Sequence, residues 1–484
     1  MRRFSLRRFA AVAAASVAIF LSSCSSGPLK HADWAPDVRS ALNDFIRTYG
    51  NGPQKEYVVF DFDNTTSIFD ISEQLMIYQL ETMSFGLTPQ EFVEAVVEPE
   101  ADAPQPVREK VAELAADYEA LYERFGPFTP AGLSEDAMQG VRESDLWKSF
   151  AIEMGHMYDF LQDFMTADEA YLWVLGWFSG MTEVELYDLA RRSHTEYSRV
   201  ETRRRSWTLG GRTHSWIDGV AVTDNLRELW KALNDNGIDV WVCSASPVMP
   251  VLAAVDAFGL HDMCRGVVAM TMSIDSTGRF GSTYDYETGY GFHAIPGGGW
   301  ERGTLPTRTQ TMSQGKVTSI VNSIAPEYSG RGPLAGFMDS TGDFCFCTEF
   351  SSLKLALCFN RADRKVTDGG ALIAETAVYE RDVLGYDLKK AAAAGDVLYL
   401  LQGRDENGLR SLRPSNLTIR FGETVQKLFR GAENEAQLEY FKQNNLTVKE
   451  ILERFCIETE AGDASNPLGF KYGFLSDYPG YRSL

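Results

Sequence analysis

The chain of 484 residues carries 67 acidic against 46 basic side chains, which gives a net charge of −21. A surface this acidic repels the phosphate backbone of nucleic acids, so nucleic-acid binding is not expected. The length suffices for a large hydrophobic core and for more than one structural unit. No apolar run reaches the about 20 residues that a membrane-spanning helix needs.

The chain begins with the features of a secretory signal peptide. Four arginines within the first eight residues precede an apolar stretch of thirteen residues, 9–21, and small residues follow it. This charge, length and exit are typical of a signal peptide, and the stretch is too short to cross a bilayer as a helix. Residues 1–23 are therefore expected to be removed, which changes the formal charge of the remaining chain to −25.

The end of this leader also indicates a lipid anchor. Leu21-Ser22-Ser23-Cys24 resembles the lipobox of bacterial lipoproteins, which implies cleavage before Cys24 and acylation of its thiol. The alternative is ordinary cleavage nearby, with Cys24 incidental. On the lipoprotein interpretation the protein is extracytoplasmic, in the periplasm or at the cell surface, and is attached to the membrane through Cys24. The six later cysteines lack the paired spacing of a metal site and leave disulfide pairing open.

The first half of the chain is mostly helical in pattern. Residues 24–55 are interpreted as a tether and a helix, because apolar residues recur at helical spacing over 38–49. An apolar strand at 57–60 follows. Residues 71–215 then show one helical pattern after another and few strand-like runs, which predicts an all-α insert. The clearest of these patterns lie at 109–125, 145–165, 169–178 and 183–200.

Strands and helices alternate again from residue 218. The apolar runs at 240–243, 266–270, 334–338 and 355–359 are too continuous for half-exposed strands, and 271–312 is typical of a hairpin and loop. This alternation predicts an α/β fold with a parallel sheet covered on both faces. Residues 56–70 and 216–484 are assigned to this core. They include a C-terminal extension without an assigned role, with one further strand-like run at 397–401.

Two acidic residues follow the first strand. Asp61 and Asp63 lie two apart, so in an extended chain their side chains point the same way. One carboxylate can attack phosphorus to form an aspartyl phosphate, and the other can protonate the leaving oxygen and then deprotonate water. The alternative is a pair of turn-forming residues, since Asp-Asn-Thr also suits a turn.

Four other candidate residues lie further along the chain. Ser244 directly follows the apolar run 240–243, where a hydroxyl and backbone amides can hold a phosphoryl oxygen, although a plain helix cap has the same pattern. Lys316 offers a compact cation for phosphate or for a carboxylate, but a lone lysine is also a common surface residue. Asp339 and Asp343 close another apolar strand, where carboxylates suit Mg²⁺ or an Asx turn.

Taken together, these positions resemble the motifs of haloacid dehalogenase superfamily phosphatases. Asp61-x-Asp63-Asn64-Thr65 is similar to the first motif, Ser244 to the second, Lys316 to the third, and Asp339-x-x-x-Asp343 to the fourth. The motifs span 56–70 and 218–360. Met338 stands where relatives commonly have glycine. Dehalogenating members lack the second aspartate, so Asp63 favours phosphoryl transfer.

The resemblance implies a role for each residue and a cofactor, Mg²⁺. Asp61 is the nucleophile and Asp63 the general acid and base, while Thr65, Ser244 and Lys316 contact the substrate. Magnesium is held by the carboxylates of Asp61 and Asp339 and by the backbone carbonyl of Asp63. Asp343 supports Lys316 or the metal shell. The implied fold is a Rossmann-like parallel sheet with a large all-α type 1 cap, residues 71–215, inserted after the first strand.

The cap suggests a small phosphorylated metabolite as substrate, because a large lid obstructs macromolecules. Asp70 lies at the entrance of the cap, where an acid faces the substrate ammonium in the phosphoserine-phosphatase-like branch; Asp70-Ile71-Ser72-Glu73 is equally typical of a helix capping box. Aromatic residues plus an acid suit a quaternary ammonium, although packing explains the aromatic residues as well. They are Trp147, Tyr158, Tyr171, Trp173, Trp177 and Phe178.

The pattern is similar to that of bacterial extracytoplasmic phosphorylcholine phosphatases, which makes phosphorylcholine the first expectation, ahead of phosphoethanolamine or phosphoserine. Two alternatives stay open: a lipid-anchored binding protein that kept the site without turnover, and a phosphotransferase. The oligomeric state does not follow from the sequence.

Overall fold

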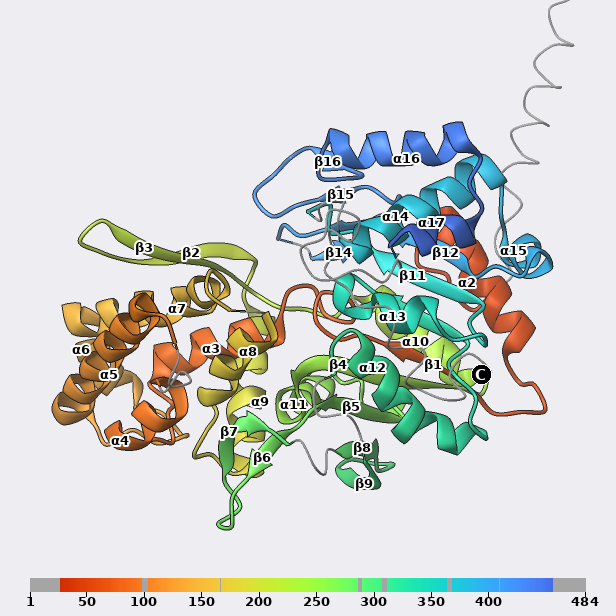
Figure 1. Ribbon diagram of the computed structural model, residues 1–484. Helices are drawn as coiled ribbons and strands as arrows, with labels where there is room; N and C mark the ends of the chain where they lie inside the picture. Colours follow the sequence, from red (N-terminus) through yellow and green to blue (C-terminus); the bar gives the residue numbers. More distant parts are fainter. Residues whose placement is uncertain are drawn as a thin grey trace, which may run out of the picture.

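The computed structural model describes residues 27–97, 103–165, 167–285, 290–306, 311–363, 368–408 and 410–455. Two parts make up this structure: a core built around a β-sheet, and a helical cap that leaves the core after the first strand (Figure 1). The signal peptide, the lipidation position Cys24 and Cys456 lie outside the described residues. The five described cysteines are buried free thiols.

The core contains an eight-stranded sheet in the order β12-β11-β10-β1-β4-β5-β8-β9. The first six strands are parallel to their neighbours, and β8 and β9 extend the sheet in antiparallel fashion. Continuous apolar sequences form the parallel strands because both of their faces are covered. The strands are β1 (Glu56–Phe60), β4 (Ile238–Pro247), β5 (Gly266–Met270), β8 (Tyr290–Ala294), β9 (Trp300–Pro306), β10 (Ala335–Met338), β11 (Leu355–Phe359) and β12 (Leu398–Gln402).

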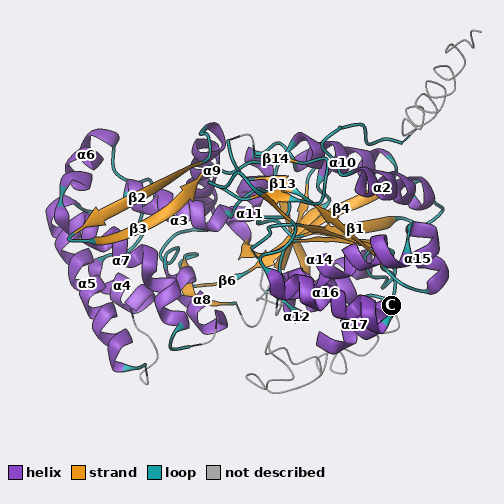
Figure 2. Ribbon diagram, turned by 90° about the horizontal axis from the view of Figure 1, so that it is seen from above, coloured by secondary structure: helices purple, strands orange, loops and turns teal. Residues whose placement is uncertain are grey.

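Each face of the sheet packs into its own hydrophobic core. In β1, Val58 and Phe60 join one core while Tyr57 and Val59 join the other, as the two-residue period of a strand requires. Helices α2 (Pro36–Tyr49), α10 (Asp224–Asp235) and α11 (Val248–Ala257) belong to the first core. The opposite face packs against α12 (Gln314–Ser319), α13 (Phe344–Thr348), α14 (Gly369–Tyr379), α16 (Ala432–Asn444) and α17 (Val448–Phe455). Figure 2 shows α12, α14, α16 and α17 on this side of the sheet.

In the described part of the cap, helices follow one another from Ile71 to Arg199, and a hairpin comes after them. Its helices are α3 (Ile71–Thr82), α4 (Pro89–Phe92), α5 (Gln105–Phe125), α6 (Glu135–Glu143), α7 (Asp145–Gln162), α8 (Ala167–Gly176) and α9 (Glu183–Arg199). The hairpin, β2 (Arg203–Leu209) and β3 (Arg212–Asp218), corrects the expectation of an entirely α-helical insert. The sequence of β2 lacks the apolar alternation that marks a strand, because Trp207 is the only residue of β2 that is buried.

The expected hairpin region, 271–312, contains two hairpins. The first, β6 (Met272–Ile274) with β7 (Phe280–Tyr284), reaches the cap, where the Gly180 amide donates to the Phe280 carbonyl at 2.9 Å. The second is the edge pair β8–β9, with three glycines of positive φ at its tip, Gly297 to Gly299. The core thus contacts the cap away from the two connecting segments.

The C-terminal region is an integral part of the core. It contributes the edge strand β12, the helix α15 (Leu388–Ala394) and a small four-stranded sheet in the order β14-β13-β15-β16. The strands of this sheet are β13 (Arg404–Asp405), β14 (Ser411–Leu412), β15 (Thr418–Ile419) and β16 (Gln426–Lys427). Among the helices of the described residues, none combines the length and apolar character that a membrane crossing requires.

Candidate active site

The acidic candidates from the sequence lie at one edge of the sheet. Asp61 follows β1 and Asp339 follows β10, and these strands are parallel neighbours with Phe60 paired to Phe337. The Asp61 amide continues this ladder by donating to the Phe337 carbonyl at 3.0 Å. The carboxyl ends of both strands therefore present their aspartates to the same space, where α/β sheets bind ligands.

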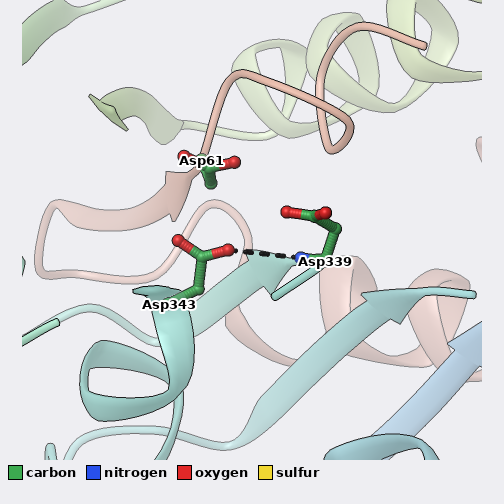
Figure 3. A group of neighbouring side chains, drawn as sticks. All are labelled: Asp61, Asp339 and Asp343. Atoms are coloured by element: carbon green, nitrogen blue, oxygen red, sulfur yellow. Dashed lines mark hydrogen bonds between the residues drawn. The ribbon is translucent and has the colours of Figure 1, made fainter. Parts of the chain in front are cut away.

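Asp61, Asp339 and Asp343 form a compact buried cluster (Figure 3). One carboxylate oxygen from each lies within 4.8 Å of the others. Asp343, at the start of α13, also accepts a hydrogen bond from the Asp339 amide at 3.3 Å. Oxygen donors in this number and spacing are the ligand type that Mg²⁺ prefers, so the residues present fit this ion.

Lys316 joins two of the three carboxylates. Its Nζ lies 2.5 Å from Asp61 Oδ1 and 2.6 Å from Asp343 Oδ1, and the lysine side chain is only 1% exposed. The surface-lysine interpretation of Lys316 therefore does not hold. A buried ammonium is tolerated because carboxylates compensate its charge.

The cluster holds more negative charge than one lysine neutralises. Burial, followed by the repulsion of Asp343 and partly opposed by Lys316, raises the pKa of Asp61 to about 8. Burial also raises the pKa of Asp343, against the attraction of Lys316. Excess negative charge in a buried cluster favours the binding of a cation, because opposite charge stabilises the ionised carboxylates.

Asp63 is held separately, between the cap and the core. Its Oδ2 accepts a hydrogen bond from Ser246 Oγ at 2.6 Å, and its Oδ1 accepts from the Ile71 amide at 2.7 Å. Burial raises the pKa of Asp63 well above its ordinary value, and the charges of Asp70 and Asp61 add to this effect. A raised pKa favours the protonated form of the carboxyl group, which can donate its proton as a general acid must.

Ser244 and Thr65, the two other substrate-binding candidates, are both buried. Ser244 lies within β4, and its Oγ accepts a hydrogen bond from the Ser246 amide at 3.1 Å. Among the described residues, the Thr65 hydroxyl has no hydrogen-bond partner. The Ser246 hydroxyl is the one that donates to Asp63, and sequence reasoning missed it because the apolar run ends at Cys243 and pointed to Ser244, the next residue.

Asp70 caps helix α3. Its Oδ1 accepts from the amides of Ser72 at 2.8 Å and Glu73 at 3.0 Å, so the helix-capping role that the sequence left open is present. Both bonds use one oxygen of the carboxylate. Burial, against these two hydrogen bonds, raises the pKa of Asp70.

Most of the aromatic candidates of the cap belong to its hydrophobic core. The side chains of Trp147, Trp173, Trp177 and Phe178 are at most 8% exposed, which fits packing and not a ligand cage. Tyr158 and Tyr171 are half-buried and meet edge to face, with ring centroids 6.1 Å apart. Burial, and then the charges of Asp70 and Asp63, raises the pKa of the Tyr171 hydroxyl, so this ring belongs to the neighbourhood of the site.

Two arginines at the site carry no local signal in the sequence. Arg361, after β11, places Nη1 3.1 Å from Asp339 Oδ2. Arg404, in β13, donates to the carbonyl of Asn64, the residue after Asp63, at 2.7 Å. Arg361 lies just after the region that contains the motifs, and Arg404 lies in the C-terminal extension, to which the sequence assigned no role. Only the fold brings both arginines to the site.

Comparisons with known proteins identify the fold alone. No protein-family model matches the chain, and no curated protein matches it. Among solved structures, the chain is similar to a conserved protein of unknown function from Anaerococcus prevotii DSM 20548, with a TM-score of 0.63 and 22% identity, over 82% of this chain and 100% of that chain. This likeness shows a shared fold.

Two further structures superpose too loosely to carry an argument. A protein of unknown function from Bordetella pertussis Tohama I has a TM-score of 0.30 and 14% identity, over 63% of this chain and 90% of that chain. A phosphoserine phosphohydrolase-like protein from Francisella tularensis subsp. tularensis SCHU S4 has a TM-score of 0.27 and 11% identity, over 63% and 87%. The architecture itself is a Rossmann-like α/β core with a helical cap inserted after the first strand, as the sequence predicted.

Proposed function

We propose that this protein is a magnesium-dependent phosphatase of the haloacid dehalogenase type, which hydrolyses a small phosphate monoester. One observation carries the proposal: Lys316, whose position only the motif pattern predicted, contacts Asp61 and Asp343 in a cluster that includes Asp339. Residues from three separate parts of the chain thus meet at the ligand-binding edge of the sheet.

In the proposed reaction, an Asp61 oxygen attacks phosphorus and forms an aspartyl phosphate, while the bond to the alcohol oxygen breaks. Asp63 gives its proton to that oxygen, then accepts one from the water that hydrolyses the intermediate. The Lys316 ammonium offsets the negative charge that develops on the phosphoryl group. A bound Mg²⁺ would neutralise phosphate and carboxylate charge and would keep Asp61 ionised.

For the substrate, we propose a phosphorylated amino alcohol or amino acid, with phosphorylcholine first. The support is the second carboxylate oxygen of Asp70, which accepts no hydrogen bond within the described part of the chain, together with Tyr171, whose hydroxyl pKa is raised by burial and by the nearby Asp70 charge. A ring face and an anion suit an ammonium group. The loss of the four buried aromatic candidates reduces the proposed cage to Tyr158 and Tyr171.

The decisive test of catalysis is phosphate release from p-nitrophenyl phosphate with and without Mg²⁺. Asp61→Asn is expected to abolish turnover, whereas Asp235→Asn, which alters a carboxylate in an exposed ion pair, is expected to leave it intact. A folded wild-type protein that releases no phosphate from this ester or from a panel of phosphorylated metabolites would exclude hydrolysis. Products formed with an added acceptor alcohol would instead reveal a phosphotransferase.

We also propose that the protein is an extracytoplasmic lipoprotein anchored through Cys24, which rests on the leader sequence. Wild-type protein is expected in the membrane fraction of the producing bacterium. Cys24→Ala is expected to move it to the soluble or precursor fraction. An unchanged distribution would contradict the lipid anchor.

A further inference from the structure

Arg404 is a buried cation of the C-terminal region that reaches the loop carrying Asp61 and Asp63. Its Nη1 donates to the Asn64 carbonyl at 2.7 Å, and its Nη2 lies 3.4 Å from the Asn64 side-chain oxygen. The arginine side chain is 1% exposed. These contacts join positions 340 residues apart in the sequence.

Asn64 is the position at which this loop turns. It directly follows Asp63 and has φ of 60°, a left-handed conformation that asparagine tolerates better than most residues. The amides of Thr66 and Ser67 then both donate to the Phe62 carbonyl at 2.9 Å, which closes a tight turn. The direction of the Asp63 carboxylate therefore depends on the backbone that Arg404 holds.

The guanidinium is itself fixed from the opposite side. Glu406 Oε1 accepts from Arg404 Nε at 3.0 Å and from Nη2 at 2.8 Å, and Glu406 Oε2 accepts from the Phe421 amide at 3.2 Å. A planar fork held by a carboxylate on one edge presents its remaining N–H groups in one direction. That direction is toward Asn64.

The same C-terminal segment also holds the chain where it returns from the cap. Arg410 Nη1 donates to the Val220 carbonyl at 2.8 Å. The first connection between core and cap passes through Asn64 to Asp70, and the second through Val220, where Ile68 and Ala221 are bridged. Arg404 and Arg410 of the C-terminal region thus bond to the two connections between core and cap.

We propose that Arg404 is a positioning residue for catalysis: through Asn64 it fixes the loop that aims Asp61 at phosphorus and Asp63 at the leaving oxygen. This inference rests on the proposed phosphatase function. Lysine cannot replace the arginine, because a single ammonium does not reach Glu406 and Asn64 in the fixed geometry of the fork. Within the described part of the chain the Arg404 side chain bonds to Asn64 and Glu406 and not to Lys316 or Asp70, so its replacement is expected to change substrate binding little.

The test compares Arg404→Lys and Glu406→Gln with the control Arg413→Lys. Arg413 belongs to the same region and contacts Asp405 at 3.4 Å, with a side chain 25% exposed. With p-nitrophenyl phosphate and Mg²⁺, Arg404→Lys is expected to lower kcat by about 100-fold with little change in KM, because small misplacements of reacting groups cost rate. Glu406→Gln is expected to lower kcat less, and Arg413→Lys to leave it unchanged.

Amide hydrogen exchange of the peptide 61–70 provides a readout that does not depend on activity. Faster exchange of this peptide is expected in Arg404→Lys and Glu406→Gln but not in Arg413→Lys. Wild-type kcat and wild-type exchange in a folded Arg404→Lys protein would overturn the inference while leaving the proposed function intact. An inactive wild-type protein would instead overturn the proposed function, and exchange alone would then decide whether Arg404 orders the loop.

Discussion

Replacing Lys316 by methionine removes the buried ammonium that compensates Asp61 and Asp343. The methionine side chain has nearly the same length, so the change deletes charge with little loss of volume. The two Nζ contacts that disappear, at 2.5 and 2.6 Å, lie in a site where the lysine is only 1% exposed. The carboxylates cannot turn to bulk water and must either stay ionised without compensation or take up a proton.

Breaking one side of a buried ion pair costs about 3–5 kcal/mol, and we expect a loss of this size in the free energy of unfolding at pH 8. The loss depends on pH in a definite direction. Burial already raises the pKa of Asp61 from 3.8 to about 8, and removal of the lysine raises it further. The unfolded chain ionises near 3.8, so ionisation favours unfolding increasingly as the pH rises. At pH 5 Asp61 is largely protonated in both proteins and gains little from the lysine, whereas near pH 8 only the wild type begins to ionise Asp61, so the variant should lose less stability at pH 5 than at pH 8.

The assay is urea unfolding in EDTA at pH 5 and pH 8. Lys231→Met serves as the control, because its ammonium pairs with Asp235 in an exposed position at 2.7 Å and should contribute less than about 1 kcal/mol. Adding Asp343→Asn to Lys316→Met removes an uncompensated carboxylate and should restore part of the loss. A loss below about 1 kcal/mol at pH 8, or equal losses at the two pH values, would refute the reasoning.

Three further predictions concern recognition, pH and packing. Asp70→Ala removes the α3 cap and should cost about 1 kcal/mol of stability, whereas Asp70→Asn keeps a capping oxygen; if the asparagine variant retains the wild-type kcat/KM ratio of phosphorylcholine to p-nitrophenyl phosphate, Asp70 does not recognise the ammonium. Burial lowers the pKa of His194 to about 4 from 6.5, so the unfolded chain binds the extra proton and stability falls by up to about 3 kcal/mol as the pH drops through this range. His194→Phe should flatten that dependence in urea unfolding at pH 7 and 4.5, and an unchanged slope would contradict the assignment. Phe337→Ala deletes a ring stacked on Phe60 at 3.7 Å in the buried sheet and should cost about 3–5 kcal/mol by thermal unfolding, so a shift equivalent to less than 1 kcal/mol would contradict this packing.

The sequence by itself determined the strands that carry the site. Runs such as 57–60, 266–270 and 355–359 are apolar throughout because parallel strands are covered on both faces, and each became a strand at or within one residue of the expected bounds. Asp61 and Asp339 follow two such strands directly. Their proximity could be predicted because the carboxyl ends of parallel neighbours meet at one edge.

Only the tertiary structure decided which other side chains reach that edge. A lysine carries no local sign of burial, and the contact of Lys316 with Asp61 spans 255 residues, so residue chemistry alone left it open while the motif resemblance supplied it. Arg404 and Arg361 had neither kind of signal. The tertiary structure also decided the role of Trp173 and Trp177. Their helical spacing suits a core or a cage, and both are buried in the packed cap, where the distant Phe85 contacts the Trp177 ring. Local sequence fixes periodicity and strand ends, whereas burial and charge pairing depend on contacts between distant segments, which the packed fold alone defines.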